Sequence, residues 1–159
     1  MELTIRKGTA ADIPAMFQLV RELAEFEKAT EEVENTEAKM LEDGFGPNPV
    51  YGSYVAEIEG EIVGMSVYYY RYSTWKGKRL FLEDLIVTEK HRGKRIGKAL
   101  FEKAIGHAVE NNCSGMVWQV LDWNTPAIDF YQKYSCQMHP EWVNCTLTLQ
   151  QLEEIHQGI

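Results

Sequence analysis

Apolar and polar positions along the chain follow two periods, and each change of period marks a predicted element. Alternating or short continuous apolar runs predict strands, and spacings of three and four residues predict helices. The predicted strands cover residues 3–6, 54–58, 62–70, 80–87, 115–121 and 142–149. The predicted helices cover residues 13–24, 36–42, 96–108 and 126–133, with a short polar helix after the last strand. Thr9 or Asp12 is expected to cap the first helix, and Glu59-Gly60 is a hairpin signal.

The order of these elements predicts a mixed sheet. Three successive strands, ending with Leu80–Val87, are expected to form an antiparallel meander. The next strand follows a helix long enough for a crossover connection, which indicates a parallel neighbour on the same sheet. The sequence therefore predicts an α/β (α+β) domain in which helices flank a central sheet.

Two carboxylates interrupt the apolar strand Leu80–Val87. Strict alternation fails in this strand, which favours burial on both faces. Glu83 and Asp84 are adjacent, so they point to opposite faces if the strand is regular. A buried carboxylate is costly without partners or a task. An ion pair of Glu83 with Arg79 or Lys78 is one explanation, and a chemical role is the other.

A basic, glycine-containing loop connects this strand to the next helix. Its sequence is Arg92-Gly93-Lys94-Arg95-Ile96-Gly97. The backbone N–H groups of a helix N-terminus bind anions, so strand, loop and helix together predict an anion site. The spacing fits neither a P-loop nor the G-x-G-x-x-G dinucleotide fingerprint. A solvated basic turn remains the simple alternative.

Composition and charge further narrow the class of protein and its possible partners. The 159 residues, 45% hydrophobic and 25% charged, suit one domain of an ordinary globular protein. A net charge of −8 argues against nucleic acid and anionic membranes as partners. We expect no metal, because the histidines form no ligand cluster, and a cytoplasmic location, because three cysteines in no metal spacing suggest reduced thiols. Nine acids between Glu22 and Asp43 indicate either a solvated helical face or a field that attracts a cation.

The loop hexapeptide resembles the R-x-x-G-x-G pyrophosphate loop of the GNAT superfamily of N-acetyltransferases. Arg95 stands where that family usually has its first loop glycine. Several further segments look like the spermidine/spermine (diamine) acetyltransferase branch, and STWKG and LDWN look most like its thialysine N-epsilon-acetyltransferase members. These segments are RELAEFEK (21–28), LEDGFG (41–46), YYYRYSTWKG (68–77), FLEDLIV (81–87) and DWNTPAIDFY (122–131).

The resemblance implies a single GNAT domain over residues 1–159 that uses acetyl-CoA as co-substrate. It places backbone groups of one strand beside the pantetheine arm, the loop at the pyrophosphate, and a second segment on the opposite side of the cofactor. These residues are Leu85, Ile86 and Val87; Arg92, Gly93, Lys94, Arg95, Ile96, Gly97 and Lys98; and Asn124, Thr125, Pro126 and Ala127. Tyr131 matches the tyrosine that protonates the leaving thiolate.

The resemblance also implies a small cationic amine as the substrate and a homodimer as the assembly. The implied substrate contacts are Phe26, Glu27, Glu83, Val117, Trp118, Gln119 and Glu141. The chemistry agrees, because an alkylammonium must lose a proton before it attacks a thioester, and Glu83 could accept that proton. Tyr131 could instead be a packing aromatic beside Phe130. Of Tyr68, Tyr69 and Tyr70, we expect at least one in the core.

Three functions remain open at this point. The first is acetyl transfer to a small amine, either a lysine-like amino acid or a diamine or polyamine, by direct attack in a ternary complex. The second is acetylation of a protein lysine or N-terminus. The third is a non-catalytic acyl-CoA-binding module. It stays open because Arg95 replaces the usual first glycine of the loop.

Overall fold

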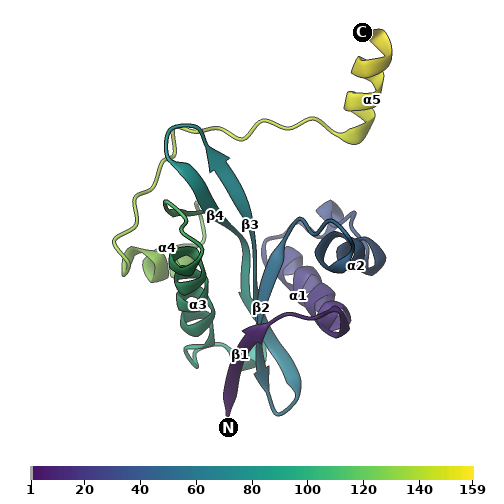
Figure 1. Ribbon diagram of the computed structural model, residues 1–159. Helices are drawn as coiled ribbons and strands as arrows, with labels where there is room; N and C mark the ends of the chain where they lie inside the picture. The colour runs from purple at the N-terminus through teal and green to yellow at the C-terminus, as the bar shows by residue number, and fades with distance from the viewer. Residues whose placement is uncertain (1) are drawn as a thin grey trace. The chain divides into compact units, whose positions relative to one another are not determined.

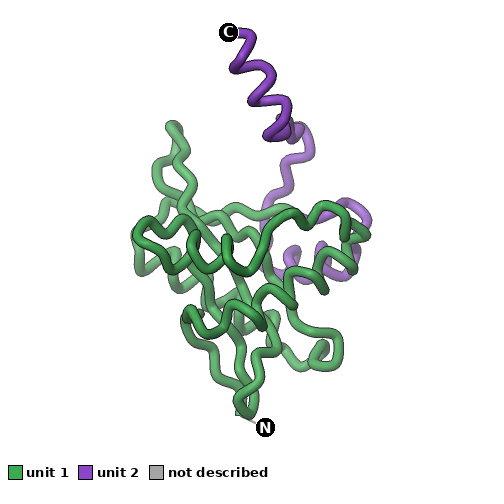
Figure 2. The backbone as a smooth tube through the Cα atoms, turned by 90° about the vertical axis from the view of Figure 1, so that its right-hand side faces the viewer, with its two compact units in different colours: residues 1–119 green, residues 120–159 purple. Residues whose placement is uncertain are grey.

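The computed structural model describes residues 2–159, which fall into two compact units. Unit 1 comprises Met1–Gln119 and unit 2 comprises Val120–Ile159 (Figure 2). No helix in the described part of the chain is long and apolar enough to span a membrane. Each unit is described by itself below.

A mixed sheet forms the centre of unit 1, as the sequence predicts, and it contains five of the six predicted strands, the last of them shorter than predicted. Its strands lie in the order β1-β2-β3-β4-β5, with antiparallel pairs up to β4 and a parallel β4–β5 pair (Figure 1). The strands are β1 (Leu3–Lys7), β2 (Gly52–Ile58), β3 (Glu61–Ser73), β4 (Gly77–Val87) and β5 (Met116–Trp118). β3 and β4 are longer than predicted, because their far ends pair with each other as a two-stranded ribbon.

Helices cover both faces of this sheet. α1 and α2 lie on one face, called here the α1 face, and α3 lies on the other, the α3 face (Figure 1). The helices are α1 (Ile13–Phe26), α2 (Glu37–Phe45) and α3 (Ile96–Glu110), and short 3-10 turns occupy Ala10–Asp12, Thr30–Glu32 and Glu89–His91. The apolar stripe of α1 packs on β2, β3 and β4 through Met16, Phe17, Val55, Met65 and Ile86.

A buried ion pair fixes the start of α1. Asp12 accepts hydrogen bonds from both terminal nitrogens of Arg6 at 2.7 and 3.0 Å and from the Thr9 backbone N–H at 2.8 Å. The hydrogen bond from Arg6 is the largest cause that lowers the pKa of Asp12 to about 2. Arg6 also donates to Glu57. The network ties β1 and β2 to the start of α1, where Thr9 and Asp12 form a capping box over the 3-10 turn Ala10–Asp12 and Asp12 is the N-cap residue of α1.

Unit 2 contains two helices, α4 (Thr125–Gln132) and α5 (Leu149–Gly158). The Asn124 side chain accepts from the Ala127 N–H and caps α4, one of the two predicted caps. The predicted last strand is wrong: residues 142–148 form no strand in the described chain. Leu149 belongs to α5, because Thr148 and Gln151 form a capping box just before it. Alternating apolar residues give an extended segment one apolar face, but the segment becomes a strand only when a neighbouring strand hydrogen-bonds to it.

Candidate active site

The two carboxylates of β4 lie at a β-bulge. Asp84 pairs with Val67 of β3, whereas Leu82, two residues earlier, pairs with Tyr68, so Glu83 is the extra residue. Val67 belongs to the core cluster of α1, and the Tyr68 ring lies 4.4 Å from the ring of His107 on α3. Leu82 therefore faces α3 and Asp84 faces α1. We predicted that Glu83 and Asp84 point to opposite faces only if the strand is regular. Because the strand is bulged at Glu83, that prediction does not apply.

A third carboxylate joins this pair. The pKa of Asp84 is raised to about 7, first by burial and then by the charges of Glu83 and Glu27. Burial also raises the pKa of Glu27, which directly follows α1. Three acids thus gather on the α1 face, two of them predicted as substrate contacts. Such a cluster favours a bound cation or holds a proton at neutral pH.

Glu83 itself is exposed and makes no ion pair with Arg79 or Lys78 in the described chain. The structural explanation offered above for this residue is therefore wrong. The raised pKa belongs to its neighbour Asp84, which is the better proton acceptor on electrostatic grounds.

Aromatic and apolar side chains lie beside the acids. Tyr69 stacks on Phe81 with ring centroids 5.1 Å apart, and Val117 pairs with Phe81 across the parallel β4–β5 ladder, so it shares the same face. The expected substrate contact at Val117 is thus near the acids. Trp118 points to the α3 face, where its ring meets Phe101 edge-on at 5.3 Å. Packing against α3 accounts for Trp118 better than substrate contact does.

The edge of β4 next to β5 becomes available beyond the bulge. The β4–β5 ladder ends at Leu82 and Trp118, although β4 continues to Val87. Within unit 1, Leu85, Ile86 and Val87 therefore pair with β3 only, and their other edge can bond an extended ligand as a strand would. The resemblance implies that this edge of β4 lies beside the pantetheine arm.

The loop before α3 presents its backbone to an anion. Gly93 has φ 77°, and a side chain added there would meet no atom within 4 Å. Arg95, the N-cap of α3, has φ 61° and no side-chain cap, so it holds a left-handed conformation that glycine adopts more easily. A helix N-terminus without a protein cap suits a pyrophosphate. These residues fit coenzyme A.

Arg92 holds the loop to the strand and to α1. Its Nε donates to the Val87 carbonyl at 2.9 Å, its guanidinium lies 5.3 Å from the Phe26 ring centroid, and Glu22 lies 3.7 Å away. Glu22 Oε1 also accepts from the Glu89 N–H. These contacts place Arg92 and Phe26 together, and they explain one acid of the Glu22–Asp43 stretch as a partner of the loop. Glu27 is another acid of that stretch with a local role, beside Asp84.

Gln119 is the last residue of unit 1, one residue beyond β5, and unit 2 carries the predicted residues from Asn124 onward. Asn124 caps α4, Pro126 lies in its first turn, and Tyr131 lies on its last turn with its ring 5.3 Å from Phe130. Glu141 is exposed and lies 3.5 Å from His139. The packing of Tyr131 on Phe130 is compatible with either of its two predicted explanations.

The other tyrosines of β3 belong to a polar cluster on the α3 face. Tyr68 is buried, which confirms that one of the three consecutive tyrosines lies in the core. His107 of α3 shares hydrogen bonds with Tyr54 through Nδ1 at 2.9 Å and with Tyr70 through Nε2 at 2.7 Å. Both ring nitrogens are occupied, so this histidine has a structural explanation.

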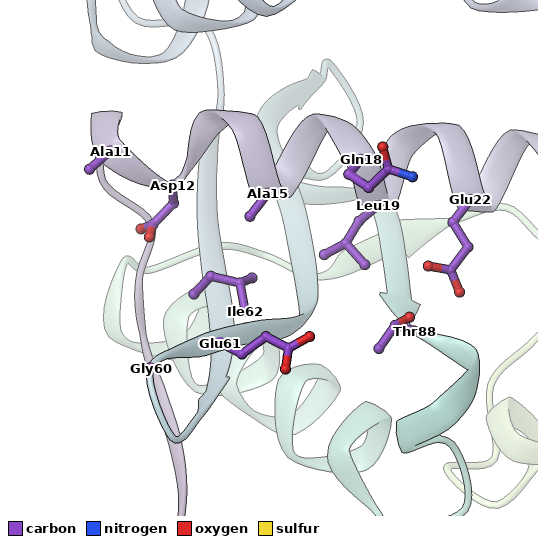
Figure 3. A pocket seen from close by; sticks show the side chains of 10 residues that line it. All are labelled: Ala11, Asp12, Ala15, Gln18, Leu19, Glu22, Gly60, Glu61, Ile62 and Thr88. Carbon is purple, nitrogen blue, oxygen red and sulfur yellow. The ribbon is translucent and has the colours of Figure 1, made fainter.

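One cavity of about 490 Å³ lies between α1, the β2–β3 turn and the end of β4 (Figure 3). None of the predicted site residues lines it. Its acids already have partners: Asp12 pairs with Arg6, Glu61 with Lys90, and Glu22 with Arg92. We therefore do not place the substrate there. Among residues 2–159, no group of three His, Cys, Asp or Glu side chains could hold a metal ion.

Asp84 and Phe81 lie beside the predicted contacts but were not predicted as site residues, whereas Tyr69 was left open between core packing and an aromatic wall for the substrate. Asp84 was visible as a second acid in an apolar strand, but regular alternation placed it on the far side. Phe81 gave no separate signal, because aromatic residues in strands usually pack in cores. The bulge that selects the face depends on strand pairing.

Residues 13–135 match the acetyltransferase (GNAT) family. The chain belongs to this family, and it is an enzyme that transfers acetyl groups to amines. GNAT acetyltransferases take the acetyl group from acetyl-CoA. The fold class and the resemblance inferred from the sequence are thereby confirmed.

Individual relatives lie in the expected branch. The chain is 40% identical to thialysine N-epsilon-acetyltransferase of Bos taurus over 141 residues, covering 84% of this chain and 83% of that protein. It is 35% identical over 134 residues to human spermidine/spermine N(1)-acetyltransferase-like protein 1, covering 80% of this chain but 19% of that longer protein. Among solved structures, an aminoglycoside N-acetyltransferase in complex with CoA shares the fold with a TM-score of 0.74 at 16% identity, covering 92% of this chain and 95% of that one.

Proposed function

We propose that this enzyme acetylates a primary amine of a small cationic substrate, either a lysine-like amino acid such as thialysine or a diamine or polyamine. The observation that carries the proposal is the gathering of Glu27, Glu83 and Asp84 on one face of the sheet. Several relatives support it, since the more similar of them are named for thialysine or for spermidine and spermine, and others are named for ornithine and streptothricin. Three neighbouring carboxylates attract an alkylammonium and disfavour an anionic or neutral substrate.

Asp84 and Glu83 have different roles toward the substrate amine. The substrate ammonium carries a proton at neutral pH, and it becomes a nucleophile only after losing it. Asp84, with its pKa raised to about 7, is suited to accept that proton, and exposed Glu83 is suited to attract the cation. Tyr69 and Phe81 provide an aromatic wall for the aliphatic part of the substrate.

The remaining steps use backbone groups and one phenol. Acetyl-CoA supplies a thioester carbonyl carbon, to which the amine nitrogen bonds directly in a ternary complex. A backbone N–H near Leu85 stabilises the oxyanion that develops, because that edge of β4 has no strand partner within unit 1. The C–S bond then breaks, Tyr131 gives its proton to the departing thiolate, and the nitrogen releases its second proton to solvent, from which the phenol regains one. The loop from Arg92 to Lys98 holds the pyrophosphate, and Asn124 to Ala127 flank the cofactor.

Three broader properties belong to the same proposal. The whole chain acts as one acetyltransferase domain, which the family match across residues 13–135 supports, since it crosses both units. The enzyme works in the cytoplasm, which the unpaired thiols of Cys113, Cys136 and Cys145 favour. It assembles as a homodimer through residues 142–159, where Trp142, Val143, Leu147 and Leu149 are exposed.

The test is release of free CoA from acetyl-CoA with thialysine, lysine, cadaverine, putrescine and spermidine, for wild type and Tyr131→Phe. We expect turnover with at least one of these amines and a loss of about 10²- to 10⁴-fold in kcat for the variant. Tyr134→Phe, which changes another tyrosine of the same unit, is the matched control and should retain activity. Binding of acetyl-CoA with no turnover of any amine would overturn the small-amine proposal, and acetylation of peptides instead would point to a protein substrate.

A further inference from the structure

Two arginines face each other on the same side of the sheet as the acids. Arg71 of β3 pairs directly with Arg79 of β4, two positions beyond the Tyr69–Phe81 pair. Side chains two residues apart on a strand share a face, so both arginines lie on the α1 face with Phe81. Arg71 is exposed and places its guanidinium carbon 5.6 Å from the Phe81 ring centroid. The four side chains form one continuous surface.

This arrangement has an electrostatic cost in the empty protein. Like charges directly opposite each other on neighbouring strands are destabilising. In residues 2–159, neither Arg71 nor Arg79 forms an ion pair with a carboxylate, and the buried Nε of Arg79 has no hydrogen-bond partner. Two guanidinium groups without a carboxylate partner, carried by directly paired residues, are a natural receptor for a carboxylate, whose two oxygens match their N–H donors.

Because Gly115 has no side chain, it leaves room for the guanidinium of Arg79. The terminal nitrogen of Arg79 lies where a side chain on Gly115 would begin, just before β5. The guanidinium therefore crosses from β4 toward the start of β5 along the α1 face, next to the strand that carries Val117. A larger residue at position 115 would displace it.

The arginines and the acids are separated by a suitable length. Tyr69 lies between them on β3, because Arg71 is two residues beyond it and Val67, which pairs with Asp84, is two residues before it. The charge of Glu83 accordingly raises the pKa of Tyr69, after burial, and the charge of Arg71 lowers it. Arg79 and Glu83 are four residues apart, which is roughly 13 Å along a strand. The Arg71 guanidinium already lies at the Phe81 ring, so an extended amino acid with a terminal amine spans the remaining distance to Glu83 over the Tyr69–Phe81 pair.

We propose that Arg71 and Arg79 bind the α-carboxylate of the substrate, so that the enzyme prefers a diamino carboxylic acid over the corresponding diamine. The carboxylate lies at the arginines, the aliphatic chain on Tyr69 and Phe81, and the distal amine at Glu83 and Asp84. The acceptor nitrogen is thus the side-chain amine. This inference rests on the proposed function and assigns its substrate class.

Lysine and cadaverine provide the sharpest test, because they differ only by the carboxylate. The experiment measures kcat/KM for both amines, and separately their binding by calorimetry in the presence of CoA, for wild type, Arg71→Gln and Arg79→Gln. We expect wild type to favour lysine, and each variant to reduce the lysine-to-cadaverine ratio by about ten- to hundredfold, as for loss of a hydrogen bond to a charged group. Cadaverine should be affected little.

Lys78→Gln is the matched control, since it removes one positive charge from the same strand while Lys78 lies against Tyr70, 4.9 Å from its ring. It should leave the lysine-to-cadaverine ratio unchanged within about twofold. Equal binding of lysine and cadaverine to wild type would overturn the inference, as would a parallel loss for both amines in the arginine variants. Turnover of cadaverine alone would overturn it while sustaining the proposed function. Failure of every amine to turn over would refute the proposed function, and the binding ratio would still decide the carboxylate site.

Discussion

Asp84 lies opposite Val67 across the β3–β4 ladder, on the face that α1 covers, although regular alternation from Leu82 would place it toward α3. The bulge at Glu83 causes this change of face. It moves one carboxylate into a partly dry environment beside two others. The functional consequence is a proton acceptor whose pKa, at about 7, matches neutral working conditions.

Asp84→Asn should remove a titration from the activity profile. In wild type, Asp84 must be ionised to accept a proton, so kcat/KM should rise as pH increases through about 7. The Asn variant should lack this rise and lose about 10²-fold or more in kcat/KM at pH 7.5. The measurement is kcat/KM between pH 5.5 and 9. Glu25→Gln, an exposed acid on α1, is the control and should keep the wild-type profile. An unchanged inflection in Asp84→Asn would assign the base elsewhere.

The same group should make stability depend on pH. Its pKa in the folded protein, about 7, lies above the value of about 3.9 in an unfolded chain, so the native state binds the proton more tightly. The contribution to stability is complete below pH 4 and is lost as pH rises to 7, by no more than about 4 kcal/mol. Urea unfolding of wild type and Asp84→Asn at pH 5 and pH 8 would show it. The variant should gain relative to wild type at pH 8.

Arg95 should be strained in its present conformation. Its φ of 61° is left-handed, which costs a residue with a Cβ about 1 kcal/mol more than glycine. We expect Arg95→Gly to be more stable than Arg95→Ala by about that amount in thermal or urea unfolding. Lys94 has no positive φ, so Lys94→Gly should instead be less stable than Lys94→Ala. The same order at both positions would refute the strain.

His107 should make the stability of the fold depend on pH below neutrality. Burial is the main cause that lowers its pKa, and Lys7, Lys78 and Lys103 lower it further while Glu110 opposes them. A base with a lowered pKa stabilises the fold above its unfolded pKa of about 6.5, and this contribution is lost as pH falls below that value. Wild type should therefore lose stability relative to His107→Gln between pH 7 and pH 5, a trend opposite to that of Asp84.

A partner of His107 offers a second measurement. Tyr70→Phe removes the hydroxyl that lies 2.7 Å from Nε2 and should cost about 1 kcal/mol at pH 7. Tyr72→Phe, at an exposed position of the same strand, should cost nothing measurable. Equal effects of the two changes would show that the hydrogen bond at His107 contributes little.

Local patterns were sufficient for most of the fold. The stripe of α1, its cap at Asp12 and the parallel strand after α3 all depend on residues close in sequence or on a connection of defined length. The site was harder, because the face of Asp84 depends on a one-residue change of register with β3. The pairing of Arg71 with Arg79 was invisible for the same reason, since the ribbon formed by β3 and β4 extends beyond the predicted strands.

The predicted strand at residues 142–149 shows a different limit. The alternation of Val143, Cys145, Leu147 and Leu149 is real, but residues 142–148 find no ladder within the described chain. Exposed apolar side chains on an extended segment favour addition to another molecule. Under the proposed homodimer, this segment would pair with a second copy rather than with the sheet of its own chain.

A chain that ends at Pro140 should therefore be monomeric, and a single change should weaken the dimer. Leu147 is 55% exposed, and burying it against a second copy is worth about 1.5–3 kcal/mol, counted twice in a symmetric dimer. Leu147→Lys should raise the dissociation constant about hundredfold or more. Thr146→Lys places the same charge on the opposite side of the segment and should have a smaller effect. Sedimentation over a concentration series distinguishes these cases, and a dimer that survives both the truncation and Leu147→Lys would place the interface on unit 1 instead.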